Sequence, residues 1–87
     1  MISRTVKIGS SNGLHARPAA VFANAAGEYD VEFTLTKDEE SVDAASLLEV
    51  MTLGAEFGDE VTLSTEDDSA TEALDALATL LEEDQEG

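Results

Sequence analysis

The apolar residues of this chain repeat with two periods, one near two residues and one near 3.6 residues, in alternating segments. A period of two is typical of a half-buried strand, whose side chains point in turn to the core and to the solvent. Turn-forming residues separate these segments, as in the stretch 9–13 and in the polar run 37–40. Strands are therefore predicted near 2–8, over 31–36, over 41–43 and around Val61 and Leu63. The second and third strands face each other across the polar run and should form a hairpin.

Three segments show the longer period, which indicates amphipathic helices. The first spans 16–27. The second begins at Ser46-x-x-Glu49, which matches a capping box, and ends near Leu53. Another match to the capping box, Ser69-x-x-Glu72, opens the last helix. The apolar face of this helix consists of Ala70, Ala73, Leu74, Leu77, Leu80 and Leu81.

The predicted elements follow in the order strand, helix, strand, strand, helix, strand, helix. Three helices are too few to cover both faces of a four-stranded sheet, so all of them should pack on one face. The fold class predicted is therefore α+β, a two-layer domain with an antiparallel sheet. With 87 residues, of which 43% are hydrophobic, the chain can build one core, and no linker separates a second domain. We expect a single domain over 1–87.

Charge is distributed very unevenly along the chain, whose formal net charge is −16. Residues 1–27 contain three Lys or Arg and no acid, whereas residues 28–87 contain one Lys and 20 acids, a net charge of −19. Such a surface repels nucleic acid, so no nucleic-acid partner is expected. The acidity favours a protein adapted to high salt, because salt screens the repulsion between its carboxylates. The alternative is an ordinary acidic protein.

The chain contains no cysteine, which argues against a disulfide framework and is consistent with a reducing compartment. Its first residues lack the long apolar core of a signal peptide, and no apolar run approaches the length that spans a membrane. We therefore predict a cytoplasmic protein with no direct membrane insertion.

His15 is the only histidine, and it lies in the segment Gly13-Leu14-His15-Ala16-Arg17-Pro18. An imidazole is the side chain best suited to nucleophilic chemistry near neutral pH. His15 falls at the entrance of the first predicted helix, where free backbone N–H groups, here those of Ala16 and Arg17, attract anions and phosphate in particular. The Arg17 side chain adds a planar cation that can bind phosphate through two hydrogen bonds.

Other roles for His15 are possible. A lone histidine is often a surface or cap residue without chemistry. A metal site is not expected, since one imidazole without cysteine would need several carboxylates, and the neighbouring segment has none. A Ser–His–Asp hydrolase needs a substrate pocket and an oxyanion hole for which 87 residues leave little room.

The second predicted helix has two apolar sides. Leu47, Leu48 and Met51 fall within about one third of its circumference, and Val50 and Leu53 fall on another side. One side can meet the sheet, and the other would then be an exposed patch of the kind that marks a partner surface. The alternative is a short helix buried on most sides.

The motif around His15, together with Ser46 and the segment Val50-Met51-Thr52-Leu53-Gly54, resembles HPr. HPr is the histidine-containing phosphocarrier of the phosphoenolpyruvate-dependent sugar phosphotransferase system. The resemblance extends over essentially the whole chain. It implies an open-faced β-sandwich with the sheet order 1-4-2-3 and three helices on one face.

The resemblance also implies a function and a set of partners. His15 would accept a phosphoryl group on Nδ1 from phosphorylated enzyme I and pass it to a sugar-specific enzyme IIA, with Arg17 stabilising the group. Leu47, Leu48 and Met51, together with Ala20, would form the docking surface for both transient partners. The chain would act as a monomeric carrier without a cofactor rather than as a stand-alone enzyme. Ser46 matches a position that a kinase phosphorylates in some branches of the family.

Two points leave the function open. Members of the family commonly carry basic residues around the docking face, where this chain has Asn24, Ala45 and Glu49. Charge-steered docking onto an acidic enzyme I is therefore not expected here, and apolar contact should contribute more. The alternative function is an HPr-like regulatory phosphoprotein, such as a nitrogen-type relay or a regulator-binding module, with no link to sugar uptake.

Overall fold

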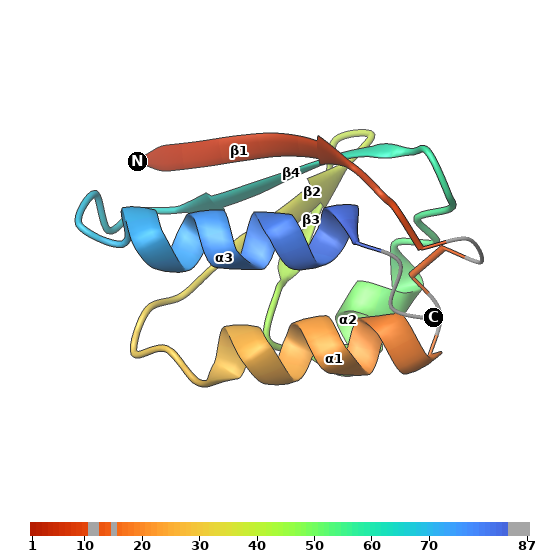
Figure 1. The fold of residues 1–87 in the computed structure, drawn as a ribbon, viewed down its shortest axis with the longest axis horizontal. Helices are drawn as coiled ribbons and strands as arrows, with labels where there is room; N and C mark the ends of the chain where they lie inside the picture. Colours follow the sequence, from red (N-terminus) through yellow and green to blue (C-terminus); the bar gives the residue numbers. More distant parts are fainter. Residues whose placement is uncertain (11–12, 15, 84–87) are drawn as a thin grey trace.

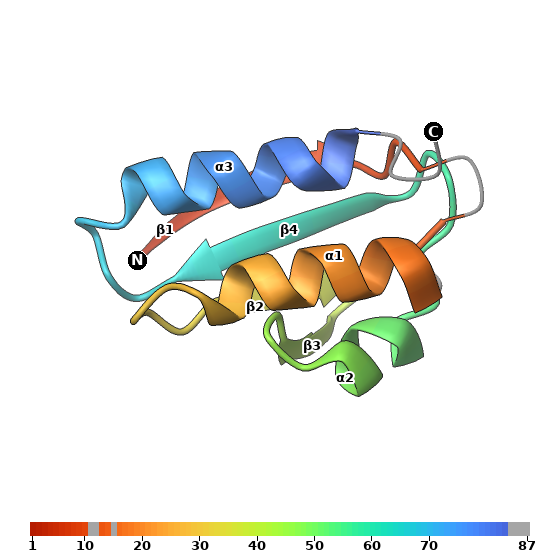
Figure 2. The ribbon, with the colours of Figure 1, turned by 60° about the horizontal axis from the view of Figure 1, so that its bottom comes forward.

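A computed structural model describes residues 1–10, 13–14 and 16–83 and shows a sheet covered by helices on one face (Figures 1 and 2). The sheet has four strands in the order β1-β4-β2-β3, and each strand is antiparallel to its neighbours. The predicted fold class and sheet order are both confirmed. The strands are β1 (Ile2–Lys7), β2 (Thr34–Lys37), β3 (Glu40–Asp43) and β4 (Glu60–Thr65), and the helices are α1 (Ala16–Gly27), α2 (Leu47–Thr52) and α3 (Thr71–Glu82).

The core lies between the two layers, as the apolar periodicity predicts. Leu35 and Leu63 are opposite each other on β2 and β4, and both are fully buried. Phe22 of α1, Val50 of α2 and Leu74 of α3 cover them from the helical side. The other face of the sheet carries short polar residues, and hydroxyl pairs connect neighbouring strands there, for example Thr5 with Thr62 at 3.0 Å.

The β2 strand is shorter than predicted. Its pairing begins at Thr34, opposite Asp43 of β3 and Ser64 of β4, whereas the alternation of apolar residues begins at Val31. Phe33 is still buried, and its carbonyl accepts a hydrogen bond from Ala44 N at 3.0 Å. The alternation therefore reports burial correctly, but β3 ends at Asp43, opposite Thr34, and its pairing with β2 goes no further.

The β2–β3 hairpin has a two-residue turn, formed by Asp38 and Glu39. Both residues have positive φ angles, 49° and 72°, as in a type I′ turn. This turn matches the right-handed twist of the strands, but it normally contains asparagine or glycine. Lys37 at its base forms an ion pair with Asp38 at 3.0 Å, and this hydrogen bond raises the pKa of the Lys37 ammonium.

Only half of the capping box predicted at Ser46 forms. The Ser46 hydroxyl accepts a hydrogen bond from Glu49 N at 3.3 Å, so Ser46 is the N-cap of α2 as expected. The Glu49 carboxylate, however, accepts from Asp43 N at 3.2 Å. The backbone N–H of Ser46 already donates to the Asp43 carbonyl, and it is therefore not available to Glu49.

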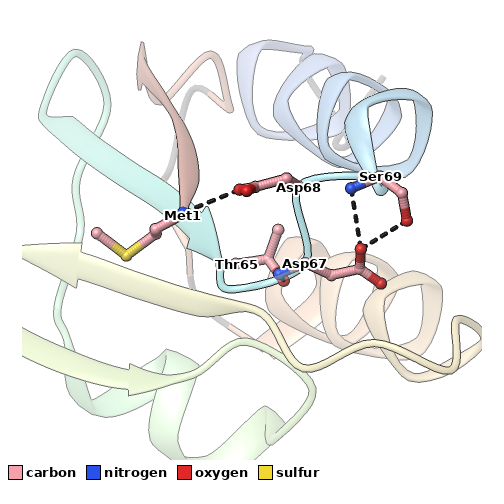
Figure 3. A network of polar contacts seen from close by, with 5 residues as sticks. All are labelled: Met1, Thr65, Asp67, Asp68 and Ser69. Atoms are coloured by element: carbon pink, nitrogen blue, oxygen red, sulfur yellow. Dashed lines mark hydrogen bonds and ion pairs between the residues drawn. The ribbon is translucent and has the colours of Figure 1, made fainter.

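The capping box predicted at Ser69 is wrong. The N-cap of α3 is Ala70, without a side-chain hydrogen bond, and the helix begins at Thr71. Ser69 instead donates from both its N–H and its hydroxyl to Asp67, which lowers the pKa of the Asp67 carboxyl (Figure 3). In the same turn, Asp68 pairs with the Met1 ammonium at 2.9 Å and raises its pKa (Figure 3). These groups lie at the opposite end of the molecule from the start of α1 (Figure 1).

Candidate functional site

Backbone hydrogen bonds hold the first two residues of the His15 motif, Gly13 and Leu14, in place. Gly13 has a φ of +78°, a conformation that favours glycine, and its N–H donates to the Ser10 carbonyl. The next residue, Leu14, is buried and donates from its N–H to the carbonyl of Ala55 at 2.8 Å. A methyl group on Gly13 would lie only 2.6 Å from that same carbonyl oxygen. Glycine is therefore required for the close approach as well as for the φ angle.

The preceding residues are attached to two further segments. Gly9 N donates to the carbonyl of Leu81 near the end of α3, and a methyl group on Gly9 would collide with the Glu82 carbonyl. Ile8 N donates to the Asp59 carbonyl, and Gly58 N donates to the Ile8 carbonyl. The end of α3 and the loop 54–59 thus fix the approach to the motif from both sides.

The helix α1 begins at Ala16, directly after the motif histidine, as predicted. His15 itself lies outside the described residues, and so do its predicted role and contacts. Arg17, the second residue of the helix, is exposed. Its side chain forms neither an ion pair nor a hydrogen bond with another described residue. The first turn of α1 contains no acid. Pro18 is buried there and does not interrupt the helix.

The start of α1 is therefore chemically suited to an anion. The first N–H groups of a helix have no intrahelical partner, and the helix dipole places partial positive charge at this end. Arg17 adds a guanidinium that no described carboxylate neutralises. Within the described residues no group of His, Cys, Asp and Glu side chains is arranged to hold a metal ion.

The apolar residues of α2 lie on two sides of the helix, and only one of these sides is buried. Val50 and Leu53 are buried in the core. Leu47, Leu48 and Met51 are exposed, with Leu48 at 74% of its possible surface. The helix lies beside α1, at the end of the molecule where α1 begins (Figure 2). Ala20, one turn into α1, is partly exposed.

An exposed aromatic residue that the sequence interpretation missed is Phe57, in the loop 54–59, with 64% of its surface accessible. Phe57 belongs neither to a strand alternation nor to a helical stripe, so periodicity does not reveal it. The sequence gives one hint of its exposure, because Phe57 directly precedes the turn-forming pair Gly58-Asp59.

The fold and this helix start define a small α+β domain in which the first turn of α1 is suited to binding an anion. Comparisons with known proteins specify the class further. The family described as "PTS HPr component phosphorylation site" matches residues 2–83. The phosphocarrier protein HPr of Streptomyces coelicolor is 44% identical over 84 residues, which cover 95% of this chain and 90% of that protein. This chain therefore belongs to the HPr family.

Solved structures and a second kind of relative agree with this assignment. A crystal structure of HPr from Thermoanaerobacter tengcongensis matches with a TM-score of 0.86 and 40% identity, covering 94% of this chain and 92% of that one. A structure described as an HPr dimer from the same organism matches with a TM-score of 0.71. The HPr-like protein Crh of Bacillus subtilis is 36% identical over 97% of this chain and 99% of its own. Among the described helices, none is both long and apolar enough to cross a membrane.

Proposed function

We propose that this protein relays a phosphoryl group from phosphorylated enzyme I to a sugar-specific enzyme IIA, with His15 as the carrier residue. The observation that carries the proposal is the start of α1, where an exposed Arg17 and an acid-free first turn directly follow the only histidine of the chain. Membership of the HPr family supports the same role.

The chemistry follows from the residues at this helix start. In the first transfer, a neutral imidazole nitrogen of His15 attacks phosphorus while the bond from phosphorus to the donor breaks. In the second transfer a nucleophile of the acceptor protein forms a bond to phosphorus while the nitrogen–phosphorus bond breaks, and His15 becomes a free imidazole again. Charge in such transfers is spread over the three phosphoryl oxygens. Arg17 and the N–H groups of Ala16 and Arg17 can bind those oxygens.

Docking of both partners would use the exposed side of α2. Leu47, Leu48 and Met51 are exposed on α2, which lies beside α1 at the end of the molecule where α1 begins. We assign the partly exposed Ala20 of α1 to the same docking surface. A carrier must present one site to two proteins in turn, so an open and apolar surface suits it better than a pocket. We propose that this exchange takes place in the cytoplasm and that the chain takes part in it as a monomer.

Ser46 is a candidate for regulatory modification rather than for transfer. Its hydroxyl caps α2, and the carboxylate of Glu49 lies in the first turn of the same helix. A phosphate on Ser46 would be favourably placed at the N-terminus of α2, and it would add negative charge beside the apolar docking surface. Phosphorylation of Ser46 should therefore weaken docking.

A regulatory role is the second candidate, and the resemblance to Crh favours it. In that case the phosphorylated chain would be read by a regulator and would not donate to an enzyme IIA. Transfer assays can separate the two functions, because only the relay consumes the phosphoryl group of the chain.

The experiment combines the chain with labelled phosphoenolpyruvate, enzyme I and the candidate enzyme IIA proteins of the same organism. The relay predicts label on an enzyme IIA that depends on the chain and disappears with His15→Ala. Label that stays on the chain in the presence of every enzyme IIA would support the regulatory role. An unlabelled chain beside an active enzyme I would contradict both.

A further inference from the structure

Phe57 is the most exposed aromatic residue of the described chain. Phe22 and Phe33 are buried in the core, whereas Phe57 exposes 64% of its surface and lies outside the core cluster. Tyr29, at 40% exposed, packs edge-on against Phe33 with ring centroids 6.0 Å apart. Among the aromatic residues of the described chain, Phe57 forms no such ring contact. Exposed aromatic side chains close to a functional site are candidates for contacts with a partner, because aromatic residues are enriched in protein interfaces.

The backbone holds Phe57 at the corner of a rigid turn. Asp59 N donates to the Glu56 carbonyl at 2.9 Å, and Gly58 has a φ of +85°. These features define a type II turn over 56–59 with Phe57 at its second position. The Asp59 carboxylate also accepts from Glu56 N at 2.9 Å, and it lies 3.8 Å from the Lys37 ammonium. Little backbone entropy would be lost if Phe57 were bound by a partner.

The same turn is in direct contact with the His15 motif. A methyl group on Gly13 would lie 2.9 Å from the Cα atom of Glu56. The backbones of Gly13 and Glu56 therefore touch, two residues before His15 and one residue before Phe57. Hydrogen bonds from Leu14 N to the Ala55 carbonyl and from Gly58 N to the Ile8 carbonyl hold the two segments together. The turn that holds Phe57 is therefore a direct structural neighbour of the segment that a phosphotransfer partner must approach.

We propose that Phe57 is a specificity-determining contact for the phosphotransfer partners of this chain, an inference that rests on the proposed function. The partner surface that fits it is an apolar pocket rimmed by Lys or Arg. The pocket follows from the rigid aromatic side chain, since such residues are frequent hot spots of interfaces. The basic rim follows from the acids around the turn, which are Glu56, Asp59 and Glu60.

A second copy of this chain does not fit the site. Each of the two copies would bring a net charge of −16. The turn 56–59 contains two acids, Glu56 and Asp59, and Glu60 follows directly. Like charges placed opposite each other across an interface oppose association. The occupant is therefore a different protein with a basic rim.

The test measures phosphoryl transfer from enzyme I at increasing concentrations of the chain. Phe57→Ala should raise KM about tenfold and change kcat less than about twofold, because the residue contacts the partner and not the reacting atoms. The loss should persist in molar KCl, since salt does not screen an apolar contact. Tyr29→Ala, which removes an exposed aromatic residue at the other end of the chain's fold, serves as the control and should leave KM unchanged.

Phe57→Lys tests the charge of the rim. A basic rim predicts a larger rise in KM than with Phe57→Ala at low salt, and the two variants should converge at high salt. A lower KM for Phe57→Lys would overturn the inferred chemistry of the pocket. Thermal unfolding of Phe57→Ala and Phe57→Lys should match the unsubstituted chain, which excludes a loss of fold. Tyr29→Ala should unfold at a somewhat lower temperature, because it loses the edge-on contact with Phe33.

The inference and the proposed function fail in different ways. If His15→Ala abolishes labelling but Phe57→Ala keeps the original KM, the inference is wrong and the relay stands. If enzyme I never labels the unsubstituted chain, the relay is wrong and the inference falls with it.

Discussion

At the scale of single residues, Arg17 shows how charge placement prepares a site. It is exposed at the second position of α1, and no described acid pairs with it, although the chain contains 20 acids. Of the three other basic side chains, Arg4 pairs with Asp75 and Lys37 with Asp38. Lys7, the last residue of β1, is exposed and is not part of any ion pair among the described residues.

Arg17→Lys should slow transfer to and from the chain more than it changes stability. Lysine keeps the charge but loses the planar fork that binds two phosphoryl oxygens at once. A tenfold loss of rate would correspond to about 1.4 kcal/mol of transition-state binding. Stopped-flow transfer assays beside thermal unfolding would measure both effects, and unchanged rates would argue against this role of Arg17.

Gly13 is a second residue whose effect can be separated from that of its neighbours. Gly13→Ala should destabilise the fold more than Gly54→Ala, although both residues have positive φ angles, +78° and +64°. A methyl group meets the Ala55 carbonyl at 2.6 Å in the first case and nothing within 4 Å in the second. Gly54→Ala should cost about 1 kcal/mol from backbone strain alone. Denaturant unfolding of both variants would check this, and equal losses would show that the close approach is unimportant.

At the scale of elements, the hairpin turn contains strain that a substitution can release. Glu39 has a φ of 72°, where a glycine would fit without the steric penalty of a side chain. Glu39→Gly should therefore stabilise the protein by about 0.5–1 kcal/mol. Glu40→Gly, at the first residue of β3, should instead destabilise it, because glycine is unfavourable in a strand. Chemical denaturation of the two variants would reveal the opposite signs.

The elements also show what sequence reasoning can reach. The helix Ala16–Gly27 was predictable to its ends, because a turn-forming stretch, a tolerated proline and a terminal glycine all agree on it. The start of β2 was not, since pairing at Thr34 depends on where β3 and β4 lie. Ser69 failed as a cap because Asp67 competes for its N–H and hydroxyl. Phe57 was missed because one aromatic residue in a turn has no period.

The sheet order has a different origin. Periodicity predicts four strands and one covered face, but it does not determine which strands are neighbours. The order β1-β4-β2-β3 came from the resemblance to HPr, and the structure confirms it. The exposed side of α2 was predictable in part. The sequence shows two apolar sides, but only the structure, in which Val50 is buried, shows which of them remains exposed.

At the scale of the whole molecule, the dominant feature is repulsion between carboxylates. The described residues contain four ion pairs, made by the Met1 ammonium, Arg4 and Lys37. Most of the described acids are exposed and form none of these pairs. Their mutual repulsion opposes the compact state.

Folding stability should therefore rise as salt is added. Screening shortens the reach of these charges from about 10 Å at 0.1 M to about 3 Å at 1 M salt. Transfer from an enzyme I with an equally negative net charge should also become faster, because partners with like net charge approach more easily when screened, whatever the charge around one local pocket. Thermal unfolding and transfer rates from low to molar KCl, beside an HPr of ordinary charge, would measure this. Flat or falling curves would mean that the acidity serves another purpose, such as binding a partner with a positive net charge.

The central claim is that His15 carries the phosphoryl group, and mapping the phosphate on the protein tests it most directly. The chain is incubated with phosphoenolpyruvate and a catalytic amount of enzyme I, and the modified residue is located at neutral pH by mass spectrometry. The account predicts one acid-labile phosphoryl group on His15 and none on a folded His15→Ala variant. Full labelling of that variant, or phosphate on any other residue of the unsubstituted chain, would contradict it.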